Sequence, residues 1–141
     1  MSLPPEYTIR AAVRNDLPEL EAFIGDFVKA NRLLPRTKDE LNELLPFGFV
    51  AMHADNLVGF AALEIYSHKL AEVRSLAVSE SARGCGVGRE LVEACVELAR
   101  QKNVLEVMAI TSAEAFFQNC GFDFTLPGEK KALFLQTRSE A

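Results

Sequence analysis

The chain has 141 residues, 49% of them hydrophobic, which is enough for one domain over residues 1–141 with one buried core. Its formal net charge of −5 argues against a nucleic-acid surface, and no apolar run reaches the length of a membrane span. Three scattered cysteines and two histidines show no metal-ligand spacing, so we expect no metal site, reduced thiols and a cytoplasmic location.

The N-terminal third is typical of a strand followed by two helices. Residues 7–12 form the strand, and Asn15 or Asp16 is placed to cap the first helix. Residues 37–40 read Thr-Lys-Asp-Glu, a capping box that predicts a short second helix ending near Leu45. The first helix has apolar residues at helical spacing, namely Leu17, Leu20, Phe23, Ile24, Phe27 and Val28.

The middle of the chain predicts an antiparallel meander. Its strands are residues 47–53, residues 57–66 and a third strand that ends at Val78, with turns at 54–56 and 67–69. The second of these strands is apolar enough to be central in the sheet.

The C-terminal half begins with a helix over residues 88–102, which is apolar on one side only. This helix is a crossover that brings a strand at 104–110 parallel to the strand ending at Val78. A short helix at 113–120 follows, and 122–125 with 132–137 form a closing hairpin. The predicted class is α/β (α+β), a mixed, mostly antiparallel sheet with helices on both faces, in the order β-α-α-β-β-β-α-β-α-β-β.

Three alternating glycines, Gly84, Gly86 and Gly88, lie where the strand ending at Val78 gives way to a helix. Bare backbone at a helix N-terminus favours an anionic ligand such as a phosphate. A P-loop needs Lys and then Ser or Thr after its last glycine, and Arg89 and Glu90 stand there instead. The dinucleotide fingerprint, with its G-x-G-x-x-G spacing, does not fit either.

The pattern Arg83-x-x-Gly86-x-Gly88 resembles the pyrophosphate-binding signature of the GCN5-related N-acetyltransferases (GNAT). The order of elements is also that of this family. The chain is most similar to the acetyltransferase domain of N-acetylglutamate synthases and their short relatives. The similarity lies in residues 33–37, 59–63, 71–78 and 116–122.

The resemblance implies transfer of an acetyl group from acetyl-coenzyme A to a small-molecule amine, with an amino acid, glutamate-like or other, as the expected acceptor. A protein or peptide N-acetyltransferase and a non-catalytic module that binds acetyl-coenzyme A remain as alternatives. The resemblance also allows a homodimer, and it implies no metal, nucleic-acid or membrane partner.

The resemblance further implies where the cosubstrate lies. Coenzyme A occupies a V-shaped gap between the strand containing Val73 and the strand containing Val104, with a strand bulge near 76–77 aiming an amide at the thioester carbonyl. The phosphates lie on the amides of the glycine loop. The residues expected at the cosubstrate are Leu76, Ala77, Val78, Arg83, Gly84, Cys85, Gly86, Val87, Gly88, Arg89 and Phe117.

Acetyl transfer needs a base for the amine, and Glu72 is the expected base, with Glu64 as second choice. Many relatives carry a proton-donating Tyr at the position of Phe117, so Phe117 is either a wall of the cosubstrate site or part of the core. A hydroxyl of Thr111 or Ser112 is an alternative donor, although capping the strand end is another role for these residues. The thiolate can also leave directly.

Two arginines are candidates for holding the carboxylate of an amino acid, because guanidinium binds carboxylates in a fork. Arg36 lies in the loop expected to cover the acceptor, and Arg74 lies in an otherwise apolar strand. A solvated loop residue and a strand salt bridge are the respective alternatives. Synthases tend to end the next strand in Thr-Thr-Arg, whereas this chain has Thr111 and Ser112, so a glutamate side chain lacks that partner here.

Overall fold

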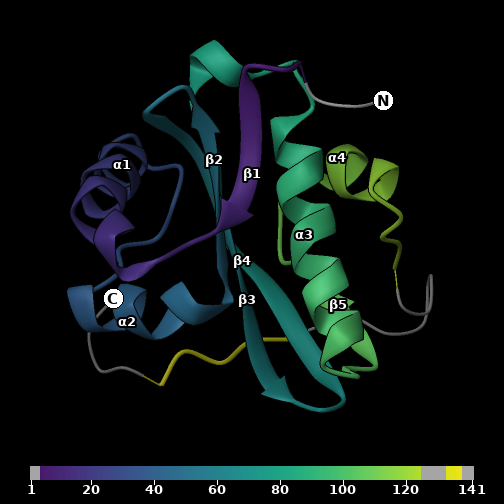
Figure 1. The fold of residues 1–141 in the computed structure, drawn as a ribbon. Helices are drawn as coiled ribbons and strands as arrows, with labels where there is room; N and C mark the ends of the chain where they lie inside the picture. The colour runs from purple at the N-terminus through teal and green to yellow at the C-terminus, as the bar shows by residue number, and fades with distance from the viewer. Residues whose placement is uncertain (1–3, 125–132, 138–141) are drawn as a thin grey trace.

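A computed structural model describes residues 4–124 and 133–137. Within these ranges, five strands form one sheet, in the order β1-β2-β3-β4-β5, between helices that cover both faces (Figure 1). The elements are β1 (Tyr7–Ala11), α1 (Leu17–Lys29), α2 (Lys38–Leu44), β2 (Gly48–His53), β3 (Asn56–Ser67), β4 (Leu70–Val78), α3 (Val87–Gln101), β5 (Glu106–Met108) and α4 (Glu114–Asn119).

The sheet is antiparallel from β1 to β4 and parallel between β4 and β5. The predicted meander and the crossover through α3 are therefore confirmed. The predicted central strand is β3, in which the seven residues from Leu57 to Leu63 are all buried. Residues buried on both faces of a strand give a continuous apolar run, which is why the sequence identified this strand.

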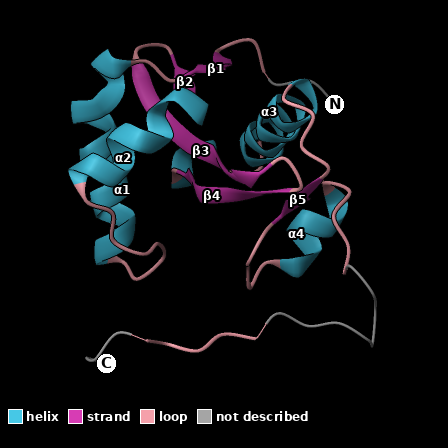
Figure 2. Ribbon diagram, turned by 90° about the horizontal axis from the view of Figure 1, so that it is seen from below, coloured by secondary structure: helices cyan, strands magenta, loops and turns pink. Residues whose placement is uncertain are grey.

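Two apolar clusters hold the helices to the sheet. Helices α1 and α2 pack on one face and α3 and α4 on the other, as Figure 2 shows from below. Gly59 in β3 lets α3 approach closely, because a Cβ there would lie 3.0 Å from Leu91 Cδ1 and 3.2 Å from Val87 Cγ1. The first turn of α3, which begins at Val87, is thereby fixed against the sheet.

The capping predictions had different outcomes. Thr37 accepts a hydrogen bond from Glu40 N, and the Glu40 carboxylate accepts one from Thr37 N, so the predicted capping box of α2 is confirmed. Asp16 is the N-cap residue of α1, as predicted, but its side chain makes no capping hydrogen bond to that helix. Its two carboxylate oxygens accept hydrogen bonds from both terminal nitrogens of Arg10 at 2.8 Å, and Val13 N donates to one of them. Because the bidentate ion pair with Arg10 is stronger than a single capping hydrogen bond, the carboxylate of Asp16 pairs with Arg10 instead of capping α1.

The predicted closing hairpin is not formed in the part of the chain that the structure describes. Residues 122–124 and 133–137 are irregular, and the rest of the predicted hairpin lies outside the described residues. Leu133 and Leu135 are 91% and 86% exposed, so neither buries a strand face against the sheet. Among the described strands, β5 pairs with β4 alone.

Within the described residues, no helix combines the length and the apolar character needed to cross a bilayer. The same part of the chain brings no three His, Cys, Asp or Glu side chains together in a way that could hold a metal ion.

Candidate functional site

The two parallel strands separate at Glu72. Their pairing runs from Leu70 opposite Glu106 to Glu72 opposite Met108, and β5 then ends while β4 continues to Val78. Among the described strands, the β5-facing edge of β4 is therefore unpaired beyond Glu72. Free main-chain donors and acceptors on such an edge can pair with an extended ligand.

A bulge interrupts β4 within this unpaired stretch. Phe60 lies opposite Ala77, but Ala62 lies opposite Arg74, so β4 has one more residue than β3 between these pairs. Ser75 carries the distortion, with a φ of +58°. The expected bulge is present, slightly nearer the start of the strand than the sequence placed it. A bulge turns main-chain groups out of the ladder, where they become available to a ligand.

The glycine loop joins β4 to α3. Gly84 and Gly86 have φ angles of +79° and +90°, and Gly86 is the N-cap residue of the helix. Among the described residues, no acceptor is found for the N–H groups of residues 84–89. These donors lie at the positive end of a 15-residue helix, an arrangement that attracts anions.

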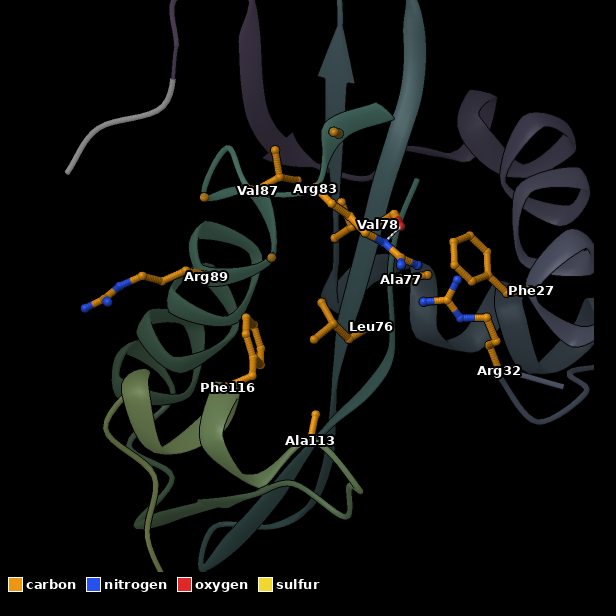
Figure 3. Close-up of a pocket in the computed structure, with 14 residues that line it drawn as sticks. Phe27, Arg32, Leu76, Ala77, Val78, Arg83, Val87, Arg89, Ala113 and Phe116 are labelled. Carbon is orange, nitrogen blue, oxygen red and sulfur yellow. Dashed lines mark hydrogen bonds between the residues drawn. The ribbon is translucent and has the colours of Figure 1, made fainter. Parts of the chain in front are cut away.

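A groove of about 640 Å³, here called the β4–α3 groove, runs along the free edge of β4 to the glycine loop. Figure 3 shows Phe116 of α4 on one side and Phe27 of α1 with Arg32 on the other. Gly88 lets Phe116 approach the helix, because a Cβ there would lie 3.3 Å from the ring. The groove is lined by Phe27, Arg32, Leu76, Ala77, Val78, Ala82, Arg83, Gly84, Gly86, Val87, Gly88, Arg89, Ala113 and Phe116.

Most of the residues expected at the cosubstrate line this groove, and two do not. Cys85 packs against the core, and Phe117 is part of the core, with 7% of its surface exposed. Phe117 makes edge contacts with Phe116 and Phe122, so its role as core is the one found here. Phe116, one residue earlier on α4, lines the wall of the β4–α3 groove in place of Phe117.

The two arginines of the loop region have different neighbours. Arg83 Nε donates to the carbonyl oxygen of Val78 at 3.3 Å, so this side chain reaches back to the strand edge. Arg89 points away from the groove in Figure 3, and its Nε donates to Glu93 at 3.1 Å. Arg83 is thus the better placed of the two to meet a ligand on the strand.

A second cavity, of about 570 Å³, lies beside the bulge and is here called the Glu72 pocket. Arg32 lines both this pocket and the β4–α3 groove, so the two cavities adjoin. The Glu72 pocket is lined by Arg32, Leu33, Leu34, Arg36, Tyr66, Glu72, Val73, Arg74, Ser75, Met108, Ile110 and Phe134.

Three polar side chains gather around Glu72. Glu64 lies opposite Glu72 in the ladder. Tyr66 follows Glu64 by two positions in β3, and Arg74 follows Glu72 by two positions in β4, so both side chains lie on the same face of the sheet as Glu72. Tyr66 donates its hydroxyl hydrogen to Glu72 Oε1. An Arg74 terminal nitrogen donates to Glu64 Oε1 at 2.8 Å, to the Tyr66 hydroxyl at 3.1 Å and to Glu72 Oε1 at 3.5 Å.

The electrostatics of this cluster follow from burial and from charge. Glu72 is only 5% exposed, and Arg74 stands beside it as a counter-charge. Burial raises the pKa of Tyr66, and its hydrogen bond to Glu72 raises it further. Burial acts to lower the pKa of Arg74, but Glu72 and Tyr66 outweigh it and keep Arg74 protonated. The cluster therefore joins a buried carboxylate to a protonated phenol and a fixed cation.

The remaining expected residues are separated by the fold. Arg36 Nε donates to Ser75 Oγ at 3.2 Å, which places Arg36 over the bulge in the Glu72 pocket. Thr111 lines a different cavity, and its hydroxyl accepts from Ala113 N at 2.8 Å, the local capping role. Ser112 is exposed and lines none of these cavities.

The residues of the two cavities that sequence reasoning missed include Tyr66, Arg32, Phe27 and Phe116. The alternation of Glu64, Tyr66, Glu72 and Arg74 along neighbouring strands was a usable signal for Tyr66. Phe27 matched the helical core pattern, and the ring lies 5.5 Å below the Arg32 guanidinium. No local pattern marks Arg32, because its place depends on the path of the loop after α1.

Comparison with known proteins agrees with this geometry. The Acetyltransferase (GNAT) family profile matches residues 14–122. An uncharacterized N-acetyltransferase of Chlorobaculum tepidum is 37% identical over 102 residues, which cover 72% of this chain and 63% of that protein. An amino-acid acetyltransferase of Mycobacterium tuberculosis is 29% identical over 117 residues, covering 81% of this chain and 67% of that one.

Comparison with solved structures also identifies acetyltransferases as similar proteins. A Mycobacterium tuberculosis protein, Rv2747, solved in complex with CoA and NLQ, superposes with a TM-score of 0.74 at 27% identity, covering 81% of this chain and 70% of that one. N-acetylglutamate synthase of Neisseria gonorrhoeae, complexed with coenzyme A and N-acetyl-glutamate, gives 0.71 at 26% identity, covering 80% of this chain but 27% of that one. The extent of the family match and the shared fold together show that this chain belongs to the GNAT family of acetyltransferases.

Proposed function

We propose that this protein transfers an acetyl group from acetyl-coenzyme A to the amine of a free amino acid. The observation that carries the proposal is the junction at Glu72, where a buried carboxylate adjoins both a free strand edge and a pocket containing Arg36. The complexes of Rv2747 and of the gonococcal synthase with coenzyme A support the choice of cosubstrate.

The β4–α3 groove is the proposed site of acetyl-coenzyme A. The unbonded N–H groups of residues 84–89 would hold the pyrophosphate at the N-terminus of α3. The free edge of β4 at 76–78 would pair with the amides of the pantetheine arm, as an added strand does. Arg83, which donates to the Val78 carbonyl, would release that carbonyl for the ligand and keep its charge near the phosphates.

The bulge at 75–76 would serve the reacting carbonyl. Because Ser75 has a positive φ, the main chain around it leaves the regular ladder beside the Glu72 pocket. An amide of this segment, aimed at the thioester oxygen, would stabilise the negative charge that grows there during attack. This assignment is supported by the lining of the two cavities, since Ser75 lines the Glu72 pocket and Leu76 lines the β4–α3 groove.

Glu72 is the proposed base. Its carboxylate would take a proton from the acceptor ammonium, after which the amine nitrogen bonds to the thioester carbon and the carbon–sulfur bond breaks. The thiolate leaves with the electron pair of that bond, since a thiol pKa of about 8.5 makes it a tolerable leaving group. The nitrogen then gives its second proton to water, and water returns a proton to the thiolate, so the products are a neutral amide and a thiol. Arg74 lies 3.5 Å from the Glu72 carboxylate as its counter-charge, and the hydrogen bond from Tyr66 fixes the orientation of that carboxylate.

Arg36 is the proposed partner of the acceptor carboxylate. Among the described residues it makes no ion pair, and its only hydrogen bond is to Ser75, so its guanidinium retains free donors. Arg74 is already paired with Glu64 at 2.8 Å, which favours its alternative role as a strand salt bridge. The two arginines are therefore assigned different tasks.

Thiol release from acetyl-coenzyme A over a panel of amino acids, amines and peptides tests the proposal. We expect release with free amino acids, and a loss of at least a hundredfold in kcat for Glu72→Gln. Glu64→Gln is the matched control, since the two carboxylates lie opposite each other and both contact Arg74.

The possible results separate the alternatives. A larger loss for Glu64→Gln than for Glu72→Gln would move the base to Glu64. Release with peptides alone would replace the proposal by peptide acetylation. Calorimetric binding of coenzyme A without release for any amine would leave a binding module in place of an enzyme.

A further inference from the structure

Part of the lining of the Glu72 pocket, here called the apolar wall, consists of large apolar side chains. Leu34 from the loop after α1, Met108 and Ile110 from β5 and its continuation, and Phe134 from near the C-terminus line it. Leu34, Ile110 and Phe134 are 76%, 58% and 68% exposed. Large apolar side chains that gather in the open around one cavity mark a surface where a ligand binds.

The charged groups of the pocket come from β4 and from the segment after α1, and most of them have partners. Arg74 pairs with Glu64, Glu72 accepts from Tyr66, and Arg36 donates to Ser75. These contacts engage both charged groups that β4 contributes to the pocket, Glu72 and Arg74. A ligand whose amine meets Glu72 and whose carboxylate meets Arg36 would therefore turn its third substituent toward this wall.

Arg32 is the one other cation of the pocket. Its guanidinium carbon lies 5.5 Å from the centre of the Phe27 ring, a position that faces the β4–α3 groove. A cation held over an aromatic face is stabilised there without an anionic partner. Arg32 therefore marks the boundary between the two cavities and leaves the apolar wall uncharged.

From this arrangement we infer that the acceptor is an amino acid with a large apolar side chain, such as leucine, methionine or phenylalanine. The inference rests on the proposed acetyl transfer and names the class of its substrate. Burial of an apolar side chain against Leu34, Ile110 and Phe134 is favourable. A side-chain carboxylate in the same place would lose hydration without gaining a partner.

Thiol release measured with leucine, methionine, phenylalanine, glutamate and aspartate at fixed acetyl-coenzyme A tests the inference. We expect kcat/KM for the apolar amino acids to exceed that for glutamate by at least about tenfold, the scale of discrimination that a hydrophobic pocket supplies. Leucinamide should be a poor substrate, because it lacks the carboxylate that Arg36 would bind.

Ile110→Lys tests the position of the side chain. Because Ile110 is 58% exposed, the fold should tolerate lysine, and we expect the leucine-to-glutamate ratio of kcat/KM to fall at least about tenfold. Leu105→Lys is the matched control, since Leu105 is 72% exposed and lines none of the cavities described, and it should leave the ratio unchanged. Leu34→Lys repeats the test from the other side of the wall.

Three results would overturn the inference, each in a distinguishable way. A preference of the unmodified protein for glutamate or aspartate would refute the apolar acceptor and leave the proposed acetyl transfer intact. Absence of thiol release with every amino acid would refute both. An unchanged ratio in both Ile110→Lys and Leu34→Lys would show that the side chain lies elsewhere.

Discussion

The glycine loop offers a test of the proposed phosphate site in which backbone strain and charge can be separated. Gly86 has a φ of +90°, so any other residue there costs about 1 kcal/mol of folding free energy, which for a chain of this size lowers Tm by about 4 °C. Gly86→Glu also brings a negative charge to the proposed pyrophosphate. At about 5 Å and an effective dielectric constant of about 40, repulsion from two phosphate charges amounts to about 3 kcal/mol.

Calorimetric titration with coenzyme A measures the effect, and the expected loss is about a hundredfold in Kd. Gly121→Glu is the matched control, because Gly121 has a φ of +98°, no atom within 4 Å of an added Cβ, and a position outside the groove. The control should lose similar stability and bind coenzyme A normally. Equal Kd values for the two variants would refute the assignment of the loop to the phosphates.

Arg36→Ala should raise the KM for the amino acid at least about tenfold and leave that for acetyl-coenzyme A nearly unchanged, because only the carboxylate contact is removed; equal changes in both constants would exclude Arg36 from the acceptor site. The Arg10 guanidinium lowers the pKa of Asp16 from its usual 3.8 by hydrogen bonding, so the pair stabilises the fold above that pH and its contribution disappears as the pH falls through the lowered value. Asp16→Asn should therefore cost about 1–2 kcal/mol of unfolding free energy in urea titrations at pH 7 and progressively less as the pH falls below 3.8; a cost that stays constant over this fall in pH would contradict this account.

The network around Glu72 explains why a buried carboxylate is tolerated at a strand fork. Glu72 is 5% exposed, yet Tyr66 and Arg74 both contact it, and the described residues contain no buried side-chain nitrogen or oxygen without a partner. A bare carboxylate in that position would destabilise the fold. The same contacts that offset the cost of burying the Glu72 carboxylate also orient it toward the pocket.

Local patterns were sufficient for much of this protein. Alternation and apolar runs predicted β3 and its neighbours, the Thr37 capping box predicted the start of α2, and the glycine spacing predicted an anion-binding turn before α3. The crossover through α3 followed from the handedness and length of a strand–helix–strand connection. Each of these depends on residues close together in the chain.

The sequence alone also suggested which residues carry charge near the reaction, but it did not decide their partners. The sequence predicted that the side chain of Asp16 caps α1, but in the fold its carboxylate oxygens lie 2.8 Å from the terminal nitrogens of Arg10. Phe116 and Phe117 are adjacent on α4, and only the packing of α4 against α3 turned the first toward the groove and the second into the core. These outcomes depend on contacts between distant segments, which local propensity does not encode.

The amino-acid sequence by itself determined the order of the elements from β1 to α4 and the glycine turn, because these reside in short-range spacing, and the motifs at these places carry the resemblance to the acetyltransferase family. Tertiary structure decided the site. The register of β3 against β4 placed Tyr66, Glu72 and Arg74 on one face, and the bulge at Ser75 set them beside Arg36, which lies 39 residues earlier in the chain. A shift of one residue in that register would have sent these side chains to the opposite face of the sheet.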